Sequence, residues 1–199
     1  MSGDRGGRRI GVFGGTFDPP HIGHLVAAID ALQVLELDVV LLVVANAPWQ
    51  KVGERTISPA ADRLAMVEAA VDGRPGIEVS DVEIRRGGLS YTADTLADLL
   101  AEEPDAELFL ILGNDAAAGF ATWERHEEVA ALATLVVVDR PGTPTPIDDG
   151  FEWTRIDIPE LEISSTELRQ RIADGRSVEY LTPPRVVAYV RERGLYARP

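Results

Sequence analysis

The sequence contains no cysteine and no uninterrupted apolar run of the ~20 residues that a membrane-spanning helix requires. Without cysteine, the fold has neither disulfides nor thiolate ligands for a metal. The short polar start, residues 1–9, also lacks the apolar segment of a secretory signal. We therefore expect a cytoplasmic protein with no membrane partner.

Positive charge is scarce as well. The chain carries 19 Lys and Arg against 33 Asp and Glu, a formal net charge of -14 at pH 7. This charge repels nucleic acid over long range, so no nucleic-acid partner is expected. Any anion site must instead gather local positive potential from a few side chains and helix ends. The 199 residues, 45% hydrophobic and 26% charged, are typical of a folded globular protein.

Short β-type runs alternate with helical stretches along the chain. The predicted strands are residues 9–13, 38–45, 77–84, 107–112, 135–138 and 153–158. The predicted helices are residues 25–37, 59–72, 91–102, 127–133, 165–174 and 183–194. This alternation predicts an α/β fold: a doubly wound, Rossmann-like parallel sheet with helices on both faces. We expect one domain, residues 1–199, with a small C-terminal helical part over about 160–199.

Capping residues mark the start or end of two of these helices. Ser58 is placed as an N-cap with Pro59 at the first helical position. Ser164 is followed by an acid in the first turn, which is typical of a helix start, and Gly175 is expected to end that helix.

Residues 14–24, GGTFDPPHIGH, follow the first predicted strand. Gly14 and Gly15, directly after a strand, allow a tight turn and close approach of a ligand to the backbone. His21 and His24 lie three residues apart at a helix start, so they can share a face beside the free N–H groups of the helix end. We predict a phosphate site in which both histidines donate hydrogen bonds and gain charge beside the anion.

Two other interpretations of the histidines stay open. A histidine near a helix start is often a cap or a surface residue, and two histidines at this spacing can bind a metal. The third histidine, His126, is far away in the sequence, and no third ligand lies nearby. We therefore predict no protein-bound metal.

Five segments in this order resemble one family. They are residues 14–24, residues 90–96 (SYTADTL), residues 113–115 (GND) with Trp123, residues 163–169 (ISSTELR), and residues 180–196. Over nearly its whole length the chain is similar to the bacterial nicotinic acid mononucleotide adenylyltransferases of the nucleotidyltransferase superfamily. The resemblance implies a reaction of NAD biosynthesis in which ATP and nicotinic acid mononucleotide give nicotinic acid adenine dinucleotide and pyrophosphate.

The resemblance also implies roles for individual residues. His21, His24 and Arg169 are the expected catalytic residues. ATP is expected to contact Gly14, Gly15, Thr16, Phe17, Gly113, Asp115, Ser164, Ser165 and Thr166. The mononucleotide is expected to contact Asn46, Lys51, Tyr91, Thr92 and Trp123. Mg²⁺ is expected to accompany ATP, bound by phosphate oxygens and water.

One departure and several alternatives remain. The loop at residues 46–51, NAPWQK, lacks the histidine that the family commonly has there, although Lys51 is present. Rival substrates are nicotinamide mononucleotide and phosphopantetheine, and a rival class is a nucleotide sensor without catalysis. A dinucleotide-binding oxidoreductase is disfavoured because the glycines of this segment do not form Gly-x-Gly-x-x-Gly. A homo-oligomer stays open.

Overall fold

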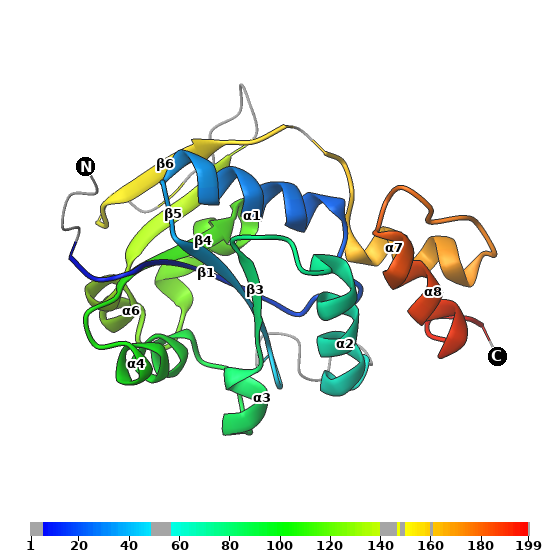
Figure 1. The fold of residues 1–199 in the computed structure, drawn as a ribbon, viewed down its shortest axis with the longest axis horizontal. Helices are drawn as coiled ribbons and strands as arrows, with labels where there is room; N and C mark the ends of the chain where they lie inside the picture. Colours follow the sequence, from blue (N-terminus) through cyan, green and yellow to red (C-terminus); the bar gives the residue numbers. More distant parts are fainter. Residues whose placement is uncertain (1–5, 49–56, 140–146, 148–149, 160, 199) are drawn as a thin grey trace.

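The computed structural model describes residues 6–48, 57–139, 147, 150–159 and 161–198. Its strands form one six-stranded sheet in the order β3-β2-β1-β4-β5-β6, and every neighbouring pair is parallel (Figure 1). They are β1 (Arg9–Gly15), β2 (Val39–Val44), β3 (Ile77–Ser80), β4 (Glu107–Gly113), β5 (Thr134–Asp139) and β6 (Trp153–Asp157). The predicted doubly wound parallel sheet is confirmed. The strand order reverses between β1 and β4, where such sheets bind ligands beyond the carboxyl ends.

Helices cover both faces of this sheet (Figure 1). They are α1 (Ile22–Val34), α2 (Ala60–Val71), α3 (Val82–Arg86), α4 (Thr92–Glu102), α5 (Asn114–Ala118), the 3-10 turn η2 (Phe120–Thr122), α6 (His126–Leu132), α7 (Ser165–Ala173) and α8 (Pro184–Glu192). Side chains of α1 and α2 pack on one face, and those of α4 to α6 and η2 pack on the other, while α3 contributes Ile84 to the first cluster and Val82 to the second. None of the described helices is long and apolar enough to cross a membrane.

Strand β1 is the centre of the sheet because it is apolar on both faces. Ile10 and Val12 belong to one core cluster, and Phe13 belongs to the other. Gly11 faces a tight space, where an added Cβ would lie within 2.8 to 3.0 Å of side-chain carbons of β2, β4 and Leu37. The strand therefore has an apolar run of the kind expected for a buried parallel strand.

The C-terminal helices α7 and α8 lie beside α2 (Figure 1). Val186 and Val190 of α8 form a core cluster with Met66 and Ala70 of α2. The predicted cap of α7 is confirmed, since the Ser164 hydroxyl accepts a hydrogen bond from the backbone N–H of Glu167 at 3.1 Å. The predicted glycine stop is also present, with Gly175 at φ 70° after the helix end.

Three local predictions were wrong. The predicted strand over residues 77–84 ends at Ser80, and α3 follows, because an alternating Val-Glu-Ile-Arg run fits a short helix when Asp81 and Arg85 pair across one turn at 2.8 Å. Ser58 does not cap α2. Pro59 occupies the N-cap position, and the Ser58 carbonyl accepts a hydrogen bond from Arg63 instead.

The third correction concerns the glycines of the first loop. Gly14 and Gly15 do not form the turn but are the last two residues of β1, paired in register with Val43 and Val44. The chain turns two residues after Gly15, at Phe17, which has a left-handed backbone with φ 49°. Backbone pairing with β2 holds both glycines in the sheet, so neither of them provides the turn.

Candidate active site

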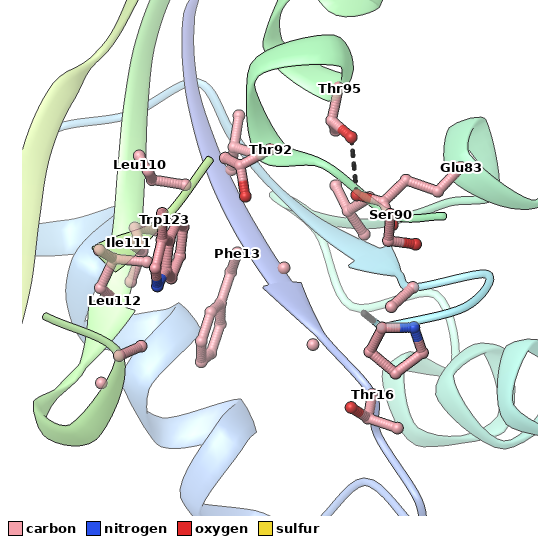
Figure 2. Close-up of a pocket in the computed structure, with 18 residues that line it drawn as sticks. Phe13, Thr16, Glu83, Ser90, Thr92, Thr95, Leu110, Ile111, Leu112 and Trp123 are labelled. Carbon is pink, nitrogen blue, oxygen red and sulfur yellow. Dashed lines mark hydrogen bonds between the residues drawn. The ribbon is translucent and has the colours of Figure 1, made fainter. Parts of the chain in front are cut away.

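Two cavities open at the carboxyl ends of β1 and β4, and they share the wall formed by Phe13, Gly113 and Ala116. We call the first the histidine cavity. It is lined by Phe13, His21, Gly23, His24, Ala27, Gly113, Asn114, Asp115, Ala116, Val138, Ile158, Pro159, Leu161 and Ile163. We call the second the tryptophan cavity (Figure 2). It is lined by Val12, Phe13, Gly14, Gly15, Thr16, Val43, Ala45, Pro48, Glu83, Ser90, Thr92, Thr95, Leu110, Ile111, Leu112, Gly113, Ala116 and Trp123.

Gly14 and Gly15 serve different purposes although they are neighbours. A Cβ at Gly14 would meet no atom within 4 Å, so this position leaves space open beside the strand. A Cβ at Gly15 would lie 2.7 Å from the Phe17 ring, so this glycine lets the ring pack directly against the backbone. Only the first of the two keeps space free for a ligand.

The Phe17 ring supports the histidines from below. It is 2% exposed and lies edge-on to the His24 ring at a centroid distance of 5.0 Å. Phe13 contacts the Phe17 ring edge-on at 6.1 Å. The left-handed turn at Phe17 thus places a buried apolar ring in contact with the His24 ring.

His21 and His24 stack on each other. Their ring centroids are 3.7 Å apart with an interplanar angle of 28°, and both rings line the histidine cavity. His21 is the N-cap residue of α1, and its backbone N–H donates to Nδ1 of His24 at 3.1 Å. Because Nδ1 accepts, a neutral His24 carries its proton on Nε2 and can donate it to a ligand. The predicted shared face of the two histidines is confirmed.

His21 is more buried than His24. The residue is 8% exposed, and its Nδ1 atom has no hydrogen-bond partner among the described residues. Burial lowers the pKa of His21 to about 4, because the charged ring loses solvation. His21 is therefore neutral at pH 7 in the protein without ligand, and an anion beside the ring would favour its protonation.

The loop between Phe17 and His21 is held by the C-terminal part. The Arg169 guanidinium donates to the carbonyl of Asp18 at 2.8 Å, and the Ser165 hydroxyl donates to the carbonyl of Pro19 at 2.8 Å. Arg169 also donates to the Thr166 hydroxyl at 3.1 Å. The resembling segments at residues 14–24 and 163–169 therefore meet, and α7 brings a cation to the loop that precedes the histidines.

Two further polar contacts close this junction. The Thr182 hydroxyl donates to the carbonyl of Pro20 at 2.7 Å, and the Tyr196 hydroxyl donates to the buried Asp18 carboxylate at 2.7 Å. Burial raises the pKa of Tyr196 far above its usual range, so the phenol stays protonated as a donor. The sequence did not reveal these contacts, because each joins residues more than 160 positions apart in the chain.

The tryptophan cavity has an aromatic side and a polar side. Trp123 packs at 5.6 Å from the ring of Phe120, and Thr92 is the first residue of α4 (Figure 2). On the polar side, the Thr95 hydroxyl donates to the Glu83 carboxylate at 2.6 Å. A flat ring would match the aromatic side beside Trp123, and the backbone N–H groups at the start of α4 could receive a polar or negative group of the same ligand.

The structure brings most of the predicted site residues to these two cavities. His21, His24, Gly113 and Asp115 line the histidine cavity, while Gly14, Gly15, Thr16, Thr92 and Trp123 line the tryptophan cavity. Asp115 lies in the first turn of α5, whose N-cap is Gly113.

Several predicted residues do not line either cavity. Asn46 donates its side-chain amide to the carbonyl of Gly88 at 2.8 Å, and Tyr91 is the N-cap residue of α4. The others are Phe17, Ser164, Ser165, Thr166 and Arg169, placed as described above. Lys51 lies outside the described residues.

Other lining residues were not predicted. Phe13 forms the shared wall, Ser90 lines the tryptophan cavity, and Asn114 lines the histidine cavity. Phe13 lies near the carboxyl end of β1 and Asn114 directly follows β4, so the rule for parallel sheets offered a signal for both. Within the described part of the chain, no three His, Asp or Glu side chains gather as a metal site would require.

Comparison with known proteins is consistent with this geometry. A family model described as cytidylyltransferase-like matches residues 12–171. A relative from Frankia casuarinae, named "Probable nicotinate-nucleotide adenylyltransferase", is 46% identical over 186 residues, covering 92% of this chain and 97% of the relative. One of the same name from Acidothermus cellulolyticus is 46% identical over 198 residues, covering 96% and 95%.

A solved structure shares the fold. The nicotinic acid mononucleotide adenylyltransferase of Plasmodium falciparum, complexed with NaAD, superposes with a TM-score of 0.76 at 20% identity, covering 95% of this chain and 97% of the other. The family model spans most of the chain, and relatives that are 46% identical cover nearly all of it. The chain therefore belongs to the cytidylyltransferase-like family and, within it, to the nicotinate-nucleotide adenylyltransferases.

Proposed function

We propose that this protein transfers the adenylyl group of ATP to nicotinic acid mononucleotide, releasing pyrophosphate and forming nicotinic acid adenine dinucleotide. A phosphate oxygen of the mononucleotide attacks the α-phosphorus, and the bond from that phosphorus to the oxygen bridging to the β-phosphate breaks. The main observation that supports this proposal is that two cavities, one lined by the histidines and the other by Trp123, share a wall at the carboxyl ends of β1 and β4. That arrangement fits two substrates whose phosphates must meet.

In this proposal ATP occupies the histidine cavity. His24 donates from Nε2 to an oxygen near the α-phosphorus, since its Nδ1 is already an acceptor. His21 gains a proton or donates as a neutral ring when the anion arrives. Arg169 supplies positive charge from α7, and Asp115 accepts from the ribose. The attacking phosphate is already ionised, so orientation and charge stabilisation supply the rate acceleration.

The tryptophan cavity would receive the mononucleotide. Its pyridine ring stacks on Trp123, and its carboxylate lies at the N-terminus of α4 beside Thr92. Gly14 leaves the space through which the mononucleotide phosphate reaches the histidine cavity. Asn46, Tyr91 and Lys51 are proposed as secondary contacts of the mononucleotide.

Mg²⁺ enters this proposal as a companion of ATP. The described residues around the histidine cavity offer two imidazoles and one carboxylate, Asp115, rather than the several oxygen ligands of a dedicated magnesium site. Phosphate oxygens and water would therefore hold the ion, which neutralises charge on the leaving pyrophosphate. A cytoplasmic location, expected from the sequence, belongs with this function.

A pyrophosphate-release assay tests the proposal. ATP is supplied with nicotinic acid mononucleotide, with nicotinamide mononucleotide or with phosphopantetheine, and also alone. We expect release above background with the first acceptor, and much less with the others. Preference for the amide would change the substrate, and nucleotide binding without release would indicate a sensor.

A further inference from the structure

One buried cation lies outside both cavities. Arg63, on the first turns of α2, is 1% exposed, and its three guanidinium nitrogens each donate to a backbone carbonyl. Nε donates to Ser58 at 2.9 Å, Nη1 to Thr16 at 3.0 Å and Nη2 to Asn46 at 2.9 Å. Burying an arginine costs free energy unless its N–H groups are hydrogen-bonded. The three carbonyls offset this cost, and in doing so the side chain connects three separate segments of the chain.

Two of the three carbonyls, those of Thr16 and Asn46, belong to the loops that would carry the substrates. Thr16 directly precedes Phe17, whose ring supports His24 at 5.0 Å. Asn46 opens the loop after β2, and its backbone N–H donates to the Ser90 hydroxyl at 2.9 Å. Ser90 in turn donates its backbone N–H to Ala47 at 3.0 Å, next to the start of α4. One side chain therefore joins the histidine support to the polar side of the tryptophan cavity.

The helix that carries Arg63 is itself fixed. The neighbouring Asp62, also buried, accepts from the Tyr189 hydroxyl at 2.8 Å and pairs with Arg193 at 3.1 Å. The core cluster between α2 and α8 adds apolar contact on the same side. Arg63 thus extends from a rigid base, and a planar guanidinium with fixed N–H directions sets the spacing of the carbonyls it holds.

We propose that Arg63 is a positioning residue that sets the distance between the loop after β1, at Thr16, and the loop after β2, at Asn46. This distance would determine how the attacking phosphate of the mononucleotide aligns with the α-phosphorus of ATP. This inference rests on the proposed function. The side chain is too buried to touch either substrate, so each substrate alone still binds. Only the approach of one to the other depends on the guanidinium, and misplacement by about 1 Å costs roughly 10²-fold in rate.

Three variants test the proposal. Arg63→Lys keeps the charge but cannot hold three separated carbonyls, and Arg63→Ala leaves a guanidinium-sized space. Val67→Ala, one turn along α2, removes side-chain volume from the buried core without touching the three carbonyl hydrogen bonds, and it serves as the control for lost core packing. For each folded variant, kcat, KM and the separate dissociation constants for the mononucleotide and a non-hydrolysable ATP analogue are measured.

We expect kcat of Arg63→Lys to fall about 10²-fold with single-substrate affinities close to wild type. We also expect low millimolar guanidinium to restore part of the turnover of Arg63→Ala, while equal methylammonium does not. Wild-type kcat in folded Arg63→Lys, or an equal loss of kcat in Val67→Ala, would overturn the proposal. Should Arg63→Ala fail to fold, Arg63→Lys decides alone. If the wild type itself forms no dinucleotide, the proposed function fails instead.

Discussion

The histidine cavity and the tryptophan cavity share a wall but are held together by different forces. The loop below the histidines is fixed by directional polar contacts from residues far along the chain, such as Ser165 to Pro19 and Tyr196 to Asp18. The tryptophan cavity rests on aromatic packing around Phe120. Groups that handle charge need fixed directions, whereas a ring site needs a flat apolar surface. Damage to the first should therefore cost turnover, and damage to the second should cost affinity and stability together.

The largest effect is expected for His24→Ala. Loss of one preorganised donor to developing charge lowers kcat by about 10²- to 10³-fold. The variant should unfold at nearly the wild-type temperature, because His24 is only partly buried. His126→Ala is the matched control, since His126 lines neither cavity. Equal losses in the two variants would remove His24 from the catalytic set.

The next effect concerns pH and the burial of His21. Its pKa of about 4 lies below the unfolded value of 6.5, so the unfolded chain binds the proton first as pH falls. The contribution of neutral His21 to the free energy of unfolding is complete above pH 6.5. It is lost as the pH falls from about 6.5 to 4, and the loss amounts to at most ~3 kcal/mol. Denaturant unfolding of wild type and His21→Gln at several pH values measures this, and parallel curves for the two proteins would contradict it.

Adjacent glycines offer a sharper contrast. Gly15→Ala forces a methyl against the Phe17 ring and should lower the free energy of unfolding by about 1–3 kcal/mol. Gly14→Ala adds a methyl where no atom of the described residues lies within 4 Å, so the free energy of unfolding should be unchanged. The KM for the mononucleotide should rise, because Gly14 lines the cavity proposed for it. Thermal unfolding and steady-state kinetics of the pair check both. Equal destabilisation of the two variants would mean that Gly14 does not border open space.

The smallest effect is expected in the aromatic wall. Trp123→Ala should weaken mononucleotide binding by roughly 1 kcal/mol, or about fivefold, while ATP affinity stays the same. Trp153→Ala is the control, because Trp153 packs against the same Phe120 ring at 5.4 Å without lining either cavity. Calorimetric titration separates the two substrates. Equal mononucleotide loss in both variants would show a general packing effect instead.

The buried strands and a helix cap could be predicted from the sequence, because they depend on periodicity and on interactions between nearby residues. The apolar runs at residues 38–45 and 107–112 are strands, and Ser164 caps its helix, because burial and capping act within a few residues. That the two histidines share a face also followed from their spacing, although the stacking of their rings did not. The turn at Phe17 could not be predicted, because a left-handed phenylalanine is held there by tertiary packing of its ring in the buried core, beside His24.

The supports of the site were also beyond sequence reasoning. Arg63 looks like any charged residue of an amphipathic helix, and its three partners are backbone carbonyls that carry no residue signature. The same holds for Thr182 and Ser165, which bond to carbonyls more than 140 residues away in the sequence. Their roles depend on the folded positions of distant segments.

The most direct test is a crystal structure with the product dinucleotide. The account predicts adenosine in the histidine cavity near Asp115, the pyridine ring on Trp123, and the bridging phosphates beside Gly14 within hydrogen-bond reach of His24. A dinucleotide bound with its two halves exchanged, or with its phosphates away from both histidines, would contradict the assignment of the two cavities.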